Sequence, residues 1–350
     1  MVFRSFAEAA PSRVDNTYML SLANTSGNGL AAITSADELL VVDRQNISAD
    51  LILTFSDVPK GVNSLKVLDE NSIVCAGGNG VVAIFDLRTQ KRVRSFKSQR
   101  AVTALACQDS KIGIGTEFAS QQAVVSVWDV RSSKQLWQNA ENNEDITCLE
   151  FHPDKDNVLL AGGDDGLVSL YDTAIVEEDD SLLQVINHSP VHLAGFLGGN
   201  RVYAVSSDQN LAIHPVSSSG DEEDPEPTRI GDLRPLIPCQ YVIDVVKSGT
   251  DFVIAAGTNI DASRVDLIKV NGAVDCSKTP SLALAQRYGL EPAHGEEVVR
   301  SIVVDESKGV IYTAGEDGRI RASREHADDS GEADVPPDIK SRNSKKKTTS

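Results

Sequence analysis

Short runs of alternating apolar and polar residues recur along the chain at a constant spacing. VVAIFD, VVSVWD and LVSLYD end on Asp86, Asp129 and Asp172, which follow one another at intervals of 43 residues. Asp43, at the end of ELLVVD, lies the same distance before Asp86. Alternation with a period of two predicts half-buried β-strands. A period of this length predicts a repeated structural unit.

The clearest unit spans residues 146–173 and 182–186. It contains four short runs, which are ITCLEF, NVLLAGG, LVSLYD and LLQVI, and turn-forming residues separate them. Four such runs predict a small antiparallel sheet. Because one small sheet cannot cover both of its own faces, we expect copies of the unit to pack against one another.

This pattern resembles the WD-repeat β-propeller family, in which four-stranded blades surround a central channel. Within that family, EDITCLEFHPDKDNVLLAGGDDGLVSLYD and HGEEVVRSIVVDESKGVIYTAGEDG are similar to the subfamily called WD repeat-containing protein 89. The resemblance covers most of residues 60–320. It implies an all-β fold and leaves the biochemical function open.

We therefore predict a single seven-bladed propeller over residues 1–324, followed by a disordered tail over 325–350. The innermost strands are expected to begin near Tyr18, Val62, Val102, Ile146, Val191, Tyr241 and Val298. The seventh unit lacks an outer strand, and the alternating residues 2–6 are expected to supply it and close the ring. Residues 217–228 are predicted to form a flexible acidic loop. Residues 281–290 are predicted to form a short helical turn.

The repeat signature weakens toward the C-terminus. Pro215, Lys269 and Arg324 occupy the aspartate position in the last three units. The Gly-His pair usual in the family is missing from most units. We expect that its hydrogen-bonded group of histidine, serine, tryptophan and aspartate forms completely in no blade.

Composition narrows the possible functions. The net charge of −18 disfavours direct nucleic-acid binding, which depends on Lys and Arg, and favours either a basic partner or simple solubility. Five dispersed cysteines without a CxxC pair indicate a reducing compartment. No apolar run is long enough to cross a bilayer, and the N-terminus lacks the apolar core of a signal peptide.

Nothing in the sequence indicates catalysis. Six histidines show no metal-ligand spacing, and neither a GxSxG motif nor a phosphate-binding GxxxxGK motif occurs. We therefore expect no metal, no cofactor and no enzymatic activity, and a propeller enzyme is a remote alternative. The expected partners are proteins, contacted by a chain that is monomeric within a larger complex.

Acidic loops of the fourth and seventh units form the first candidate binding site. In a propeller, the loop before the inner strand and the turn after the second strand open on one face, at the channel mouth. This rim either binds a Lys- and Arg-rich segment of a partner, of a histone or ribosomal-protein type, or is only solvated and binds no ligand. We expect Arg100 and Arg300 to lie near it. Its predicted residues are Glu144, Asp145, Asp164, Glu296, Glu297, Arg300 and Glu316.

A second candidate is the Asp-x-Arg sequence that follows the aromatic residue in two consecutive units. Asp86 with Arg88, and Asp129 with Arg131, resemble the motif by which some WD-repeat proteins dock on the adaptor of a cullin ubiquitin ligase. The alternative is that these arginines recur for structural reasons.

The C-terminal stretch KSRNSKKK reverses the charge of the chain. A basic cluster on a mobile tail is typical of a nuclear-localisation signal, and the alternative is a tail that is merely soluble. On the first interpretation we expect a nuclear protein that also exchanges with the cytoplasm. The residues of this cluster are Lys340, Arg342, Lys345, Lys346 and Lys347.

Overall fold

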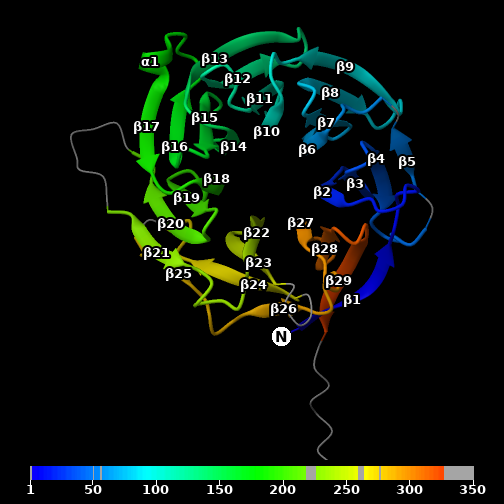
Figure 1. Ribbon diagram of the computed structural model, residues 1–350. Helices are drawn as coiled ribbons and strands as arrows, with labels where there is room; N and C mark the ends of the chain where they lie inside the picture. The colour runs from blue at the N-terminus through cyan, green and yellow to red at the C-terminus, as the bar shows by residue number, and fades with distance from the viewer. Residues whose placement is uncertain are drawn as a thin grey trace, which may run out of the picture.

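A computed structural model describes residues 2–49, 51–55, 57–217, 226–258, 264–275 and 277–326. Its strands form a ring of seven antiparallel blades around a central channel, as Figure 1 shows. Each blade begins with its innermost strand, and the next strands follow outward in sequence order, except that the outer strand of the last blade comes from the N-terminus. The predicted all-β propeller is confirmed.

The first five blades are separate four-stranded sheets. Blade 1 consists of β2 (Met19–Asn24), β3 (Gly29–Thr34), β4 (Leu39–Asp43) and β5 (Leu53–Phe55). Blade 2 consists of β6 (Val62–Asp69), β7 (Ser72–Gly77), β8 (Val81–Asp86) and β9 (Lys91–Lys97). Blade 3 consists of β10 (Val102–Gln108), β11 (Lys111–Thr116), β12 (Ala123–Asp129) and β13 (Lys134–Asn142). Blade 4 consists of β14 (Ile146–Phe151), β15 (Val158–Gly163), β16 (Leu167–Asp172) and β17 (Leu182–Asn187). Blade 5 consists of β18 (Val191–Phe196), β19 (Arg201–Ser206), β20 (Asn210–Pro215) and β21 (Thr228–Asp232).

The last two blades share one sheet. Blade 6 is built from β22 (Tyr241–Ser248), β23 (Asp251–Thr258), β24 (Arg264–Asn271), the short β25 (Ser281–Leu282) and β26 (Tyr288–Leu290). Blade 7 is built from β27 (Val299–Asp305), β28 (Val310–Gly315), β29 (Ile320–His326) and β1 (Val2–Ala9). All seven inner strands begin within one residue of the predicted positions.

The N-terminal strand closes the ring, as predicted. β1 pairs with β29 in antiparallel register, from Val2 opposite His326 to Ala9 opposite Ile320. β1 also pairs in parallel with β26, where Val2 and Phe3 lie opposite Gly289 and Leu290. This second ladder joins blades 6 and 7 by backbone hydrogen bonds, which the sequence did not indicate.

The helical turn predicted over residues 281–290 is wrong. This segment forms β25, a turn and β26, and β26 serves as the outer strand of blade 6. The helix of the described chain is instead α1 (Glu178–Ser181), before β17. At the other predicted boundary, β29 extends to His326, and the rest of the predicted tail lies outside the described residues, as do residues 218–225 of the acidic loop.

Aromatic side chains fill the space between neighbouring blades. Phe85 contacts Phe55 of blade 1 with a ring separation of 5.1 Å, and Trp128 stacks on Phe96 of blade 2 at 4.6 Å. Tyr171 contacts Trp137 of blade 3 at 5.3 Å. Each such pair stabilises the fold by about 0.5–1.5 kcal/mol beyond the burial of its apolar area. The aromatic residue of the repeat therefore has a structural role.

The regularly spaced aspartates end the third strand and organise the turn that follows. Asp43 Oδ1 accepts the backbone N–H of Gln45, and Asp172 Oδ1 accepts the backbone N–H of Ala174. Asp86 and Asp129 make the same kind of contact in blades 2 and 3. An Asp side chain in a turn satisfies backbone donors that leave the sheet, which explains the repeat.

Candidate interaction surfaces

In blade 4, the loop and the turn that carry the predicted rim residues contact each other. The loop before β14 touches the turn between β15 and β16, because Asp164 N donates to the carbonyl oxygen of Asp145 at 2.9 Å. Glu144 and Asp164 are exposed. Asp145 is half-buried, and its Oδ1 accepts the N–H of Phe118 at 2.6 Å. Asp145 therefore also holds the neighbouring loop of blade 3.

The blade 7 part has the same construction, with one difference in charge. Glu316 N donates to Val298 O at 2.9 Å, which joins the turn after β28 to the loop before β27. Arg300 Nε donates to Glu316 Oε1 at 2.7 Å, so these two rim residues form an ion pair. Glu296 and Glu297 are exposed. The negative charge of this part therefore resides mainly on the loop before β27.

The two parts of the rim lie on the same face of the ring. In each blade the strands alternate in direction, so the loop before the first strand and the turn after the second strand share one face. Blades 4 and 7 lie on opposite sides of the channel, as Figure 1 shows. A partner segment that contacts both parts must therefore cross the channel mouth.

The Asp-x-Arg residues lie on the opposite face, in the turn after the third strand. Asp86 accepts the backbone N–H groups of Thr89 and Arg88, and Arg88 Nη2 lies 3.2 Å from its Oδ2. The hydrogen bonds from the Thr89 backbone and the Arg88 side chain lower the pKa of Asp86.

Blade 3 repeats this turn with a different partner. Asp129 Oδ2 accepts the hydroxyl and the N–H of Ser132 at 2.5 and 2.7 Å, and these bonds lower its pKa. Arg131 is exposed, and 69% of the Arg88 side-chain surface is also accessible. Both aspartate side chains therefore accept hydrogen bonds within their own turns, and both arginine side chains are accessible to solvent.

The central channel that the family resemblance implies contains a cavity of about 430 Å³, and the charged residues that line it were not predicted from the sequence. Every inner strand contributes to its wall, through Ser21, Ser64, Thr103, Thr147, Leu193, Asp244 and Ser301 among others. Lys66, Glu150 and Arg300 also line it. Burial raises the pKa of Glu150 to about 7 and also raises the pKa of Asp244. The signal in the sequence is a single acid inside the apolar inner strands ITCLEF and YVIDVV.

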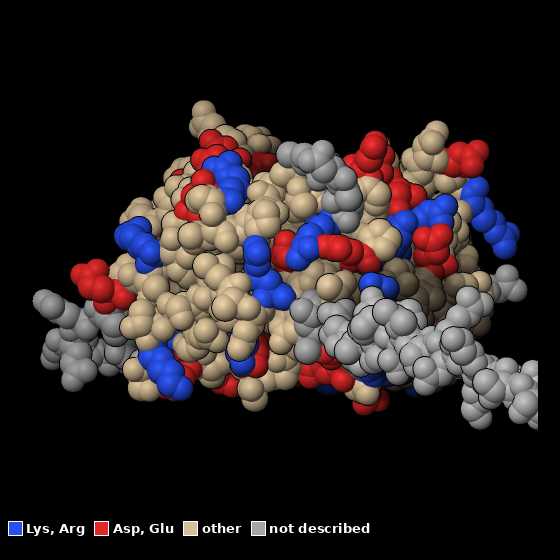
Figure 2. Space-filling view, turned by 90° about the horizontal axis from the view of Figure 1, so that it is seen from below, with Lys and Arg blue, Asp and Glu red and all other residues tan. Residues whose placement is uncertain are grey.

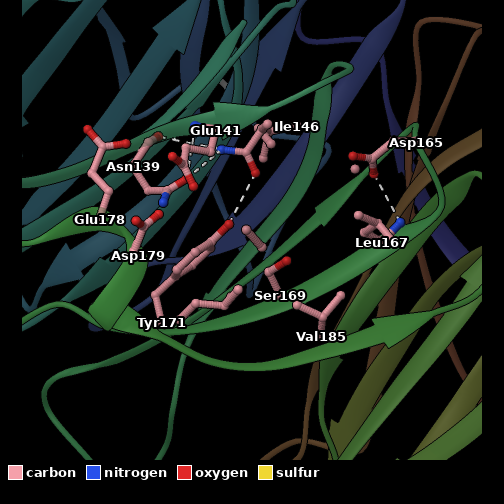
Figure 3. A pocket seen from close by; sticks show the side chains of 14 residues that line it. Asn139, Glu141, Ile146, Asp165, Leu167, Ser169, Tyr171, Glu178, Asp179 and Val185 are labelled. Atoms are coloured by element: carbon pink, nitrogen blue, oxygen red, sulfur yellow. Dashed lines mark hydrogen bonds between the residues drawn. The ribbon is translucent and has the colours of Figure 1, made fainter.

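An acid-lined cleft lies between blades 3 and 4 and has a volume of about 190 Å³ (Figure 3). Tyr171 Oη donates to Asn142 Oδ1 at 3.2 Å within it. Glu141, Glu178 and Asp179 gather at one end, and the charge of Asp179 contributes most to raising the pKa of Glu141. The sequence did not predict this cleft, because two blades and α1 build it together.

Comparison with known proteins identifies the family. The family model described as "WD domain, G-beta repeat" matches residues 134–172. A WD repeat-containing protein of Schizosaccharomyces pombe is 31% identical over 330 residues, which cover 83% of this chain and 97% of the relative. The chain belongs to the WD-repeat family.

Two further WD-repeat relatives agree with this assignment. One, from Saccharomyces cerevisiae, is 30% identical over 272 residues, which cover 74% of this chain and 67% of the relative. The WD repeat-containing protein 89 homolog of Dictyostelium discoideum is 22% identical over 323 residues, which cover 87% of this chain and 82% of the relative. WD-repeat proteins generally serve as scaffolds for protein–protein interactions.

One WD-repeat hydrogen-bond network survives in part, in blade 7. The buried ring of His294 contacts Thr313 Oγ1 through Nε2 at 2.9 Å and Asp317 Oδ1 through Nδ1 at 2.7 Å. Burial alone would raise the pKa of Asp317, but bonds from His294 and Arg321 outweigh it and lower the pKa to about 2. Ser323 stands where strong members have tryptophan, and Thr313 takes the place of the serine, so this blade keeps the histidine, a hydroxyl group and an aspartate.

The described cysteines are free thiols. Burial raises the pKa of Cys148 and Cys239 to about 11 and of Cys107 to about 12, and it raises the pKa of Cys75 still further. These four groups are therefore protonated at neutral pH, as expected for small buried side chains. Cys276 lies outside the described residues.

Two other observations concern the described part of the chain alone. It contains no group of three or more His, Cys, Asp or Glu side chains that could hold a metal ion. None of its helices is long and apolar enough to cross a membrane. The predicted nuclear-localisation residues, Lys340, Arg342, Lys345, Lys346 and Lys347, lie outside it.

Proposed function

We propose that this WD-repeat protein is a non-enzymatic scaffold whose acidic rim binds a basic segment of a partner protein. The observation that carries the proposal is the state of the rim carboxylates. Glu144, Asp164 and Glu297 are exposed on one face, and none of them has an ion-pair partner among the described residues. Elsewhere on that face, Arg300 neutralises Glu316.

The position of these carboxylates suits an extended cationic segment. They lie on both sides of the channel mouth, so a segment that crosses the mouth meets negative charge at each end. Charges in such an arrangement accelerate association and select partners more than they increase the final affinity. Histone tails and ribosomal-protein extensions have the required chemistry, since both are extended and rich in Lys and Arg.

The charge of the molecule is not arranged in this way everywhere. Figure 2 shows the side of the ring near β1 and β26, where acidic and basic side chains are interspersed. Opposite charges at close range compensate each other there, so that side offers a cationic segment weaker attraction than the rim does.

Titration with a labelled peptide of alternating Arg, Lys and Gly tests the proposal. The triple variant E144K/D164K/E297K should weaken binding at least tenfold, because it replaces three attractive charges by repulsive ones. Asp145 is left intact because it holds Phe118. The matched control E70K/D156K/E325K makes the same net change at exposed positions that the strand order places away from the rim, and it should bind nearly as well as the wild type. Equal losses in both variants would contradict a specific rim site.

The cullin-adaptor reading is the second candidate, and the exposure of Arg88 and Arg131 on one face of adjacent blades favours it. It predicts that R88A/R131A abolishes co-purification of the adaptor while the rim variant retains it. If both variants retain or both lack the adaptor, docking through the Asp-x-Arg residues is excluded.

A further inference from the structure

Strand β9 and the loop after it carry a concentration of positive charge that is unusual for this acidic chain. Residues 91–100 contain five basic side chains and no Asp or Glu, although the whole chain has 51 acidic and 33 basic residues. Arg92 pairs with Asp57 at 2.5 Å. The other four have no ion-pair partner among the described residues, and they are Lys91, Arg94, Lys97 and Arg100.

Two of these cations line a cleft of about 260 Å³ between blades 2 and 3. Lys97 and Arg100 meet neutral polar side chains there, and none of the described residues that line the cleft is Asp or Glu. The polar side chains are Ser98, Gln99, Thr116, Gln122, Ser126, Gln135 and Gln138. Amide and hydroxyl groups can donate hydrogen bonds to an anion without adding competing negative charge.

The acid-lined cleft of Figure 3 is the counterpart of this base-lined cleft, one blade further along the chain. Counted from the aspartate that ends the third strand, Ser126 and Trp128 correspond to Ser169 and Tyr171, so the two clefts share a framework. On this framework Gln122 of the base-lined cleft corresponds to Asp165, and Ser98 corresponds to Glu141. The same backbone positions therefore carry acidic side chains in one cleft and neutral side chains in the other. The fold would allow carboxylates between blades 2 and 3, but the described residues that line that cleft include none.

We propose that the base-lined cleft binds a phosphorylated side chain of a partner protein. A phosphate group carries a charge of about −2 and three acceptor oxygens, which match a guanidinium, an ammonium and several neutral donors. A long polyanion such as nucleic acid is disfavoured, because it would extend beyond this local patch onto a chain with a net charge of −18. A single phosphate is affected mainly by charges within the screening length of about 8–10 Å.

The test uses the purified full chain and two labelled peptide libraries, fixed at a central phosphoserine or at a central serine and otherwise degenerate. The wild type should bind the phosphoserine library at least tenfold more tightly than the serine library. The variant K97Q/R100Q should lose this preference. The transplant S98E/Q122D should lose it as well, although it leaves both cations in place, because it introduces the carboxylates that the neighbouring cleft carries.

The control E141S removes a carboxylate from the acid-lined cleft and should leave the phosphoserine preference unchanged. Melting curves of all variants establish whether they are folded. If K97Q/R100Q does not fold, the variant S98E/Q122D still tests the proposal. The proposal is overturned if the folded variants keep the wild-type preference, if neither library is distinguished, or if single-stranded DNA of 20 nucleotides binds more tightly than the phosphoserine library. The rim variant should keep the preference, so this proposal and the proposed function can fail separately.

Discussion

Arg44 Nη1 donates a hydrogen bond of 3.1 Å to Asp305 Oδ2 and so links the first blade to the last. Arg44 lies in the turn after β4, and Asp305 ends β27. The two side chains are 11% and 4% exposed. Tyr312 Oη donates to the backbone carbonyl of Arg44 at 2.7 Å and supports the same junction. Ring closure therefore rests on a buried ion pair in addition to the pairing of β1.

Breaking this pair should destabilise the fold strongly. Replacing Asp305 by Ala leaves the guanidinium of Arg44 buried without its carboxylate, which typically costs about 3–5 kcal/mol. Lys308, 3.9 Å from Asp305, does not compensate for this loss because it is also a cation. The free energy of unfolding in urea measures the effect. The exposed pair Arg88–Asp86 is the control, since R88A should cost less than about 1 kcal/mol, and equal costs would contradict this account of closure.

Removal of residues 1–10 should lower the melting temperature by several degrees. The deletion exposes the edge of β29 and removes the parallel ladder between β1 and β26. Differential scanning calorimetry measures the change. Substitution of the half-exposed Phe6 by Ser keeps both ladders and should have a much smaller effect. An unchanged melting curve for the deletion would refute closure by the N-terminal strand.

The channel carboxyl of Glu150 should make stability depend on pH. Its pKa rises from an ordinary value near 4.5 to about 7 in the folded chain, so the folded state favours the protonated carboxyl. The resulting contribution to stability is fully present at pH values below about 4.5 and is lost as the pH rises through 7. Asp244 and Lys66 influence the same group, the first raising its pKa and the second lowering it. Substitution of Glu150 by Gln should therefore stabilise the protein at pH 8, by about 3 kcal/mol, and have little effect at pH 4. Urea unfolding at both pH values measures the difference, and a stabilisation of equal size at both would contradict the assigned cause.

The basic cluster of the tail should direct a reporter to the nucleus. Fusion of residues 325–350 to a fluorescent cytosolic protein tests this, with Lys340, Arg342, Lys345, Lys346 and Lys347 changed to Gln in the control. Nuclear accumulation that the control lacks supports the signal. An even distribution of the unmodified fusion would remove the argument for a nuclear protein.

The architecture was predictable because its determinants are local. The aspartate that ends the third strand in the first four blades recurs at a fixed interval, and the alternation of residues 2–6 identifies the closing strand. β26 was missed because three residues give too short a pattern to distinguish a strand from a turn. A bridge between two blades also cannot be inferred from either segment alone.

The sites were less predictable because they combine residues from several blades. The sequence placed Glu144 and Glu297 on loops of one face, but it did not indicate that Arg300 pairs with Glu316. The acids of the channel were missed because the alternation of an inner strand marks Glu150 only as a polar position and does not distinguish the channel wall from the outer surface. The two clefts could not be predicted because each lies between the outer strand of one blade and the strands of the next blade.

Quantitative affinity purification from native extract, with wild type and E144K/D164K/E297K compared, is the most direct test of the central claim. The account predicts that the variant loses a set of partners with Lys- and Arg-rich segments. Those partners should elute from the wild type at moderate salt, because exposed ion pairs are screened. The control E70K/D156K/E325K should retain them. An identical set of partners on the wild type and the rim variant would contradict the rim as the binding site.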